Sequence, residues 1–208
     1  MENVNSKQVI LSVIGISILI LAVVGVSYAI FSLTLNGSQE NRLTTGTISM
    51  SYVEATNGIS IDNAMPISDE EGKNLSGENE KFDFTISADI AGITTVHYEI
   101  SAEKITDYSE QILDKDIKLY LQKKSGDIYV DTPITSTPKA FIPLDTDSLV
   151  GVPSGQMILY SSTFSNKTPS LNTYSESFRL RMWLADTANI DNISRSFKVK
   201  VNVYSKTL

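Results

Sequence analysis

The chain of 208 residues contains no cysteine and only one histidine, His97. Without cysteine there is no disulfide, no thiolate nucleophile, no zinc–cysteine site and no iron–sulfur cluster. A single histidine also excludes every motif that needs two, including the paired-histidine helix of zinc proteases. We therefore expect no metal site, no cofactor and no enzymatic activity.

Basic residues are also scarce, since 17 Lys and Arg stand against 24 Asp and Glu and give a net charge of -7. Nucleic-acid binding needs clustered Lys and Arg to neutralise phosphates. The sequence has no basic stripe or tail, so it argues against nucleic acid as a partner.

Charge is absent altogether from Val9 to Phe31, a run preceded by Lys7 and followed by no ionisable residue until Glu40. As a helix, this run would be roughly 34 Å long, which is enough to cross a bilayer. Residues 9–31 are therefore predicted to contact the membrane, at least before processing. With Lys7 on the inner side, the positive-inside rule directs the remainder of the chain outside the cytoplasm.

Two fates of this hydrophobic helix stay open. Ser27 and Ala29 supply the small residues that a signal peptidase reads, which predicts a mature protein beginning at Ile30. The length of the run instead favours a retained anchor. Residues 1–29 are thus a signal peptide or membrane anchor, and the product is extracellular or at the cell surface, and membrane-anchored if they are retained.

Beyond the hydrophobic run, apolar residues recur with a period of two, which indicates half-buried strands. The clearest segments are 47–53, 82–86, 96–101, 117–121, 157–164, 178–184 and 197–203. They predict an all-β fold, an antiparallel β-sandwich of jelly-roll type, in a single domain over residues 47–208. We expect the last two segments to pair with each other, and the acidic stretch 68–81 to be a solvated loop.

Residues 30–46 are predicted to be an N-terminal strand and a flexible connector. Phe31, Leu33 and Leu35 alternate with Ser32 and Thr34, so the strand has one apolar face. Such a strand must pair with a sheet edge, either its own or that of a neighbouring copy. Pairing with a neighbour would be a head-to-tail contact that does not close, and contacts of that kind produce fibres.

Two further sets of residues are candidates for binding. Arg179, Arg181 and Trp183 share the polar face of one predicted strand, and Arg and Trp are enriched at binding hot spots. This candidate partner-binding face is either open to a partner or covered by a loop or the other face of the sandwich. His97 beside Glu99 has the elements of a metal or acid–base pair, but without a second His or Cys a solvated strand surface is the simpler interpretation.

The N-terminal region resembles a known family. Tyr28-Ala29-Ile30-Phe31 and then Leu43-Thr44-Thr45-Gly46-Thr47-Ile48 are similar to the TasA/camelysin family of exported Gram-positive surface and biofilm-matrix fibre proteins, with weaker similarity through Met65-Pro66 and Phe82-Asp83-Phe84. The resemblance covers roughly the first 100 residues. It implies a jelly-roll fold, processing by a dedicated signal peptidase, and fibres in which the N-terminal strand of one subunit completes the sheet of the next.

The first functional hypothesis is an exported surface or extracellular-matrix structural protein whose main partner is itself, through N-terminal strand exchange. The alternative is a membrane-tethered or secreted binding module that recognises a carbohydrate or a protein through the Arg179–Trp183 face. An exported enzyme is the third class, and the sequence offers no catalytic constellation for it.

Overall fold

The computed structural model describes residues 32–36, 43–44, 48–54, 59, 64–106, 111–143, 148–189 and 197–207. The predicted membrane segment lies outside these residues, and so do the processing residues Ser27, Ala29 and Ile30 and the first assembly residue, Phe31. Among the residues described, no helix is long and apolar enough to cross a membrane. The chain consists of two compact units, residues 1–33 and residues 34–208. The two sheets belong to the second unit, except for the first two residues of the strand at Ser32–Asn36.

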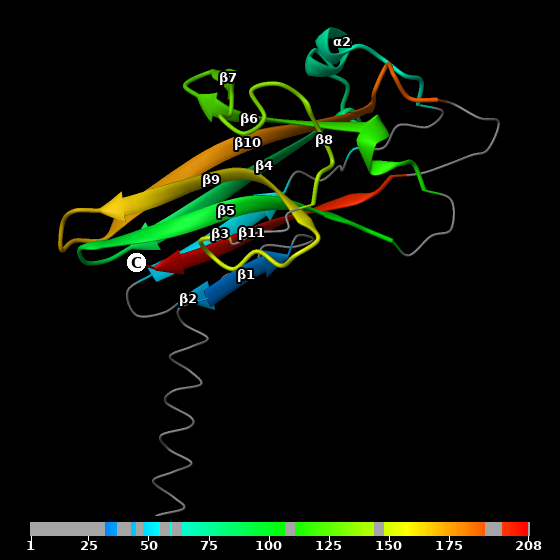
Figure 1. The fold of residues 1–208 in the computed structure, drawn as a ribbon. Helices are drawn as coiled ribbons and strands as arrows, with labels where there is room; N and C mark the ends of the chain where they lie inside the picture. Colours follow the sequence, from blue (N-terminus) through cyan, green and yellow to red (C-terminus); the bar gives the residue numbers. More distant parts are fainter. Residues whose placement is uncertain are drawn as a thin grey trace, which may run out of the picture. The chain divides into compact units, whose positions relative to one another are not determined.

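The described part of the chain is mostly β (Figure 1). The strands are β1 (Ser32–Asn36), β2 (Leu43–Thr44), β3 (Ile48–Glu54), β4 (Lys81–Ile90), β5 (Thr94–Lys104), β6 (Ile117–Ser125), β7 (Ile128–Asp131), β8 (Lys139–Ala140), β9 (Gln156–Asn166), β10 (Asn172–Leu184) and β11 (Val199–Thr207). A short helix, α2 (Asp69–Lys73), and a 3-10 turn, η1 (Asp114–Asp116), are the other elements.

The strands form two antiparallel sheets packed as a β-sandwich, which confirms the predicted fold class at that level. The small sheet has the order β1-β11-β5-β9. The large sheet has the order β2-β3-β4-β10-β6-β7, with β8 paired to β6. Successive strands therefore cross repeatedly from one sheet to the other.

The core lies between the two sheets and follows the predicted period of two. Along β4, Phe84, Ile86, Ala88 and Ile90 are buried while the residues between them are half-buried. The Phe84 ring stacks on Phe178 of β10, with the ring centroids 5.5 Å apart. Alternation locates these strands because successive side chains of a strand point to opposite faces of its sheet.

The predicted pairing of the last two strands is wrong. β10 pairs with β4 and β6 in the large sheet, with Phe178 opposite Phe84, whereas β11 pairs with β5 in the small sheet. Alternation identifies a strand but carries no information about its neighbour. In this sandwich the chain leaves the large sheet after β10 and returns in the small sheet.

The acidic stretch 68–81 contains α2, which the sequence prediction of a solvated loop missed. The Ser68 hydroxyl accepts a hydrogen bond from the backbone of Glu71, and the Glu71 carboxylate accepts one from the Ser68 backbone in return. These hydrogen bonds from Ser68 lower the pKa of Glu71. The reciprocal pair is a capping box, and the signal for it was the Ser-x-x-Glu spacing.

Candidate functional site: an apolar cleft between the sheets

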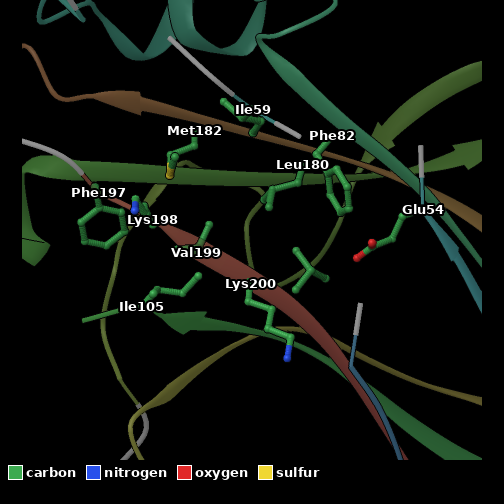
Figure 2. Close-up of a pocket in the computed structure, with 11 residues that line it drawn as sticks. Glu54, Ile59, Phe82, Ile105, Leu180, Met182, Phe197, Lys198, Val199 and Lys200 are labelled. Carbon is green, nitrogen blue, oxygen red and sulfur yellow. The ribbon is translucent and has the colours of Figure 1, made fainter. Parts of the chain in front are cut away.

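An apolar cleft of about 430 Å³ lies between the two sheets, and its lining comes from both of them (Figure 2). The large sheet contributes Glu54 of β3, Phe82 of β4, and Leu180 and Met182 of β10; the small sheet contributes Val199, Lys200 and Val201 of β11; Ile59, Ile105, Phe197 and Lys198 complete the lining.

The period of two explains why apolar side chains converge there. Leu180 and Met182 share one face of β10, and Val199 and Val201 share one face of β11. Leu180 and Val201 are buried core residues, while Met182 and Val199 are only half-buried. The cleft is therefore an extension of the core toward the surface, suited to apolar side chains rather than to a polar substrate.

The cleft lies beside the strand at which the small sheet receives β1. In the strand order, β1 is the terminal strand of the small sheet and β11 is its neighbour. Alternate side chains of any strand paired to β11 on that side point to the same face of the sheet as Val199 and Val201. A strand at this position and the apolar cleft are thus parts of one feature.

The candidate partner-binding face is largely covered by the segment that contains α2. Trp183 is 3% exposed and Arg181 is 7% exposed. A Cβ atom built on Gly72 would lie 2.2 Å from the Trp183 ring, so the helix backbone rests directly on the indole. The Arg181 Nε donates to the Leu75 carbonyl at 2.6 Å, and burial lowers the pKa of this guanidinium.

Arg179 remains half-buried. Its guanidinium makes two 2.7 Å hydrogen bonds to the Asp83 carboxylate and lies 4.0 Å from the centre of the Tyr129 ring. The hydrogen bonds to Asp83 raise the pKa of Arg179. The three predicted residues share a strand face as expected, but a partner reaching Arg181 or Trp183 would first have to displace α2.

The interpretation of His97 and Glu99 as a solvated strand surface is wrong for Glu99, which is 3% exposed, while His97 is half-buried. Glu99 is a buried residue whose carboxylate accepts hydrogen bonds from the hydroxyls of Ser148 and Ser161. Within the described ranges, no group of three or more His, Cys, Asp or Glu side chains is placed to hold a metal ion.

A polar cluster inside the sandwich was missed by the sequence prediction. Lys123 of β6 forms a 2.8 Å ion pair with Glu176 of β10, and the hydroxyl of Tyr98 donates to the same carboxylate. Lys123 also lies 5.7 Å from the centre of the Tyr160 ring. The signal was present, because Lys123 and Glu176 occupy the apolar parity of their strands.

This cluster changes the ionisation of its members. Although burial lowers the pKa of Lys123, the hydrogen bond that Lys123 donates to Glu176 and the charge of that carboxylate raise this pKa overall. Burial, together with Glu176, raises the pKa of Tyr98 far above its ordinary value. Outside this cluster, burial and then the hydrogen bond to Asp131 raise the pKa of Tyr120 to about 12.

The raised tyrosine pKa values predict that stability decreases in alkali. An unfolded tyrosine loses its proton near pH 10, whereas folded Tyr98 and Tyr120 keep theirs to higher pH. The unfolded state then binds fewer protons, so the free energy of unfolding falls as the pH rises above about 10. Each such group contributes a slope of up to about 1.4 kcal/mol per pH unit.

Tyr120→Phe should remove one of these protons. We expect the slope of unfolding free energy against pH to become shallower between pH 10 and 12, measured by denaturant unfolding at a series of pH values. Below pH 9 the curves of the variant and the parent should run parallel, offset only by the lost hydrogen bonds of the hydroxyl. An unchanged slope above pH 10 would contradict the assignment to Tyr120.

Comparisons with known proteins neither support nor contradict the resemblance to the TasA/camelysin family. No protein-family model and no curated protein matches the chain. Among solved structures, that of TmCBM61 in complex with beta-1,4-galactotriose is similar over 85% of this chain and 87% of that one, with 6% identity and a TM-score of 0.21. So low a TM-score carries no argument about fold or function, and membership of the TasA/camelysin family stays a prediction.

Proposed function

We propose that this chain is an exported surface or extracellular-matrix subunit that assembles head to tail by exchange of its N-terminal strand. The observation that carries the proposal is the position of β1, which is the terminal strand of the small sheet and neighbours β11 beside the apolar cleft. The uncharged run 9–31 supports export, either with cleavage after Ala29 by a signal peptidase or with retention as a membrane-anchoring helix.

We further propose that the sandwich is a jelly roll. The four strands of the small sheet, in the order β1-β11-β5-β9, and four of the seven strands of the large sheet, in the order β4-β10-β6-β7, are connected by a chain that crosses between the sheets. This arrangement supports a jelly-roll topology. In such a fold β1 belongs to the sheet itself. The same place can then be taken by the equivalent strand of a neighbouring copy, as in domain swapping.

The energetics favour exchange at high subunit concentration. Exchange replaces one pairing by an identical one, so its intrinsic cost is low. Burying Phe31, Leu33 and Leu35 in a neighbouring subunit would contribute roughly 5 to 9 kcal/mol gross, before ordering and association costs. A subunit that donates its own strand has an open edge to accept another, and this reciprocity makes an open chain of subunits.

The binding-module alternative is supported by the cleft rather than by the Arg179–Trp183 face. A volume of about 430 Å³ is within the range of ligand pockets, roughly 300 to 1,000 Å³. Its apolar lining suits apolar side chains of a protein segment better than the hydroxyls of a carbohydrate. A protein partner inserted at the cleft is also what strand exchange supplies.

Paired substitutions test the proposal. In the full chain produced by an exporting host, Leu33→Asp with Leu35→Asp should leave a folded protein that forms no filaments, because charge cannot enter the apolar interior. The matched control, Ser32→Asp with Thr34→Asp, changes the opposite face of the same strand and should still form filaments. Electron microscopy and sedimentation velocity distinguish the two. Filaments in the Leu33/Leu35 variant, or a parent protein that stays monomeric at high concentration, would overturn strand exchange.

A further inference from the structure

β9 is the terminal strand of the small sheet at the end opposite β1 (Figure 1). It pairs with β5 from Thr94 opposite Asn166 to Glu103 opposite Gln156, and no other described strand pairs with it. A strand in this position presents one row of backbone N–H and C=O groups that its own sheet does not use.

Only the second half of β9 is open to solvent. Residues 156–160 are buried or half-buried, and the backbone N–H of Ile142 approaches Met157 there at 3.5 Å. Ser161, Thr163 and Ser165 are exposed. The register shift of the strand falls at Ile100/Ser101, opposite the covered half, so the open half is regularly paired.

The open half is also firmly positioned. Phe164 is buried between the exposed residues and stacks on Tyr98, with ring centroids 4.8 Å apart. The Tyr174 hydroxyl donates to the Ser165 carbonyl at 2.8 Å, which leaves that oxygen a second lone pair. The edge is therefore a rigid template that need not be ordered on binding.

This edge lacks the devices by which proteins usually protect a free strand. β9 has 11 residues, and none of them is charged or proline. The two ends of the large sheet differ, since β2 has two residues and β7 has four, with Asp131 among them. Short strands and charges block edge-to-edge pairing, and an edge without them is open to strand addition.

We propose that Ser161–Ser165 is an interface at which a second copy of this chain pairs, β9 against β9, about a two-fold axis through Thr163. Antiparallel self-pairing then sets Ser161 opposite Ser165 and Thr163 opposite its own copy. No like charges meet, and hydroxyls face hydroxyls. The chain already uses this type of contact between strands, at 2.9 Å for Thr95 and Ser165 and 2.9 Å for Thr85 and Ser177.

This isologous contact uses the edge opposite β1, so it is independent of strand exchange and goes beyond it. Strand exchange would build a chain of subunits, and β9 pairing would join two such chains side by side into a continuous small sheet.

Single cysteines test the inference, because the natural chain has none. Directly opposed strand residues have Cα atoms about 4.5 to 5.5 Å apart, which a disulfide spans. In the full chain, and in the Leu33→Asp/Leu35→Asp background that blocks strand exchange, Thr163→Cys should oxidise to a covalent dimer. Ser161→Cys and Ser165→Cys should crosslink when mixed but not separately. Ser175→Cys, exposed on the central strand β10, is the matched control and should form no covalent dimer.

A charge at the axis provides a second measurement. Thr163→Lys should weaken the dimer by about tenfold or more in sedimentation equilibrium, because it sets two ammonium groups opposite each other. Thr173→Lys, exposed on β10, should leave the dimer unchanged. The inference fails if Thr163→Cys crosslinks no faster than Ser175→Cys. It also fails if Thr163→Cys crosslinks preferentially to Leu33→Cys of another copy, since the neighbour's N-terminal strand would then occupy this edge.

Discussion

Gly72→Ala is expected to force α2 away from Trp183 and to expose the indole to water. The added Cβ would lie 2.2 Å, 2.3 Å and 2.6 Å from three carbons of the indole ring. Alanine is favoured over glycine by about 1 kcal/mol in a helix, so propensity alone predicts a more stable protein. Overpacking of a rigid buried ring costs about 1 to 3 kcal/mol and more when neither side can yield, so we expect the steric term to exceed the gain.

The fluorescence of Trp183 reports this displacement without interference, because the chain has one tryptophan. A red-shifted emission and a lower midpoint of denaturant unfolding are expected for Gly72→Ala. Gly77→Ala is the matched control in the same segment, since its added Cβ meets the flexible end of the Glu80 side chain. If Gly72→Ala is as stable as the parent with unshifted emission, α2 does not rest on Trp183 as described.

The same contact shows what strand alternation can and cannot predict. Arg179, Arg181 and Trp183 were assigned to one polar strand face, and they do share a face of β10. The burial of Arg181 and Trp183 depends on the segment that contains α2, which comes more than a hundred residues earlier in the chain. No local pattern links Gly72 to Trp183. The close contact with Trp183 leaves no room for a Cβ at position 72 and therefore requires glycine there. The glycine alone does not indicate such a contact, because glycine is common in acidic loops for other reasons.

Strand alternation also predicts the strands of the two sheets better than it predicts how they are arranged. Period-two patterns located most strands because burial of one sheet face imposes them directly. They could not assign strands to sheets, so β10 and β11 were expected to pair although they lie in different sheets. The cleft likewise escaped prediction, since it depends on how β3, β4 and β10 face β11 rather than on any motif.

Ser148→Ala is expected to release the loop at residues 148–152 from the small sheet. The Ser148 hydroxyl donates to the buried carboxylate of Glu99 and accepts from the backbone N–H groups of Val150, Gly151 and Val152, at 3.1, 2.9 and 2.8 Å. One oxygen therefore joins a charged group of β5 to three donors of the loop. Alanine removes all four hydrogen bonds at once.

The loss should be large because the groups left behind are polar and partly buried. Among the described residues, Glu99 would keep the weaker 3.4 Å hydrogen bond from Ser161. A buried group left without its partner costs about 1 to 3 kcal/mol. Val150 and Val152 remain packed on Tyr204, so the loop should loosen rather than unfold the sandwich. We expect a decrease of about 2 to 3 kcal/mol in the free energy of unfolding.

Hydrogen exchange of the loop amides distinguishes this effect from general destabilisation. In Ser148→Ala, the N–H groups of Val150 and Val152 should exchange much faster, while those of the buried strand residue Ile100 change only as far as global stability requires. Ser161→Ala is the matched control: it removes a single long hydrogen bond to the same carboxylate and should cost well under about 1 kcal/mol. Both variants remove a hydrogen-bond donor to the Glu99 carboxylate, but only Ser148→Ala removes the acceptor of the loop N–H groups. Equal effects of the two substitutions on the loop amides would therefore mean that Glu99, and not the Ser148 hydroxyl, holds the loop.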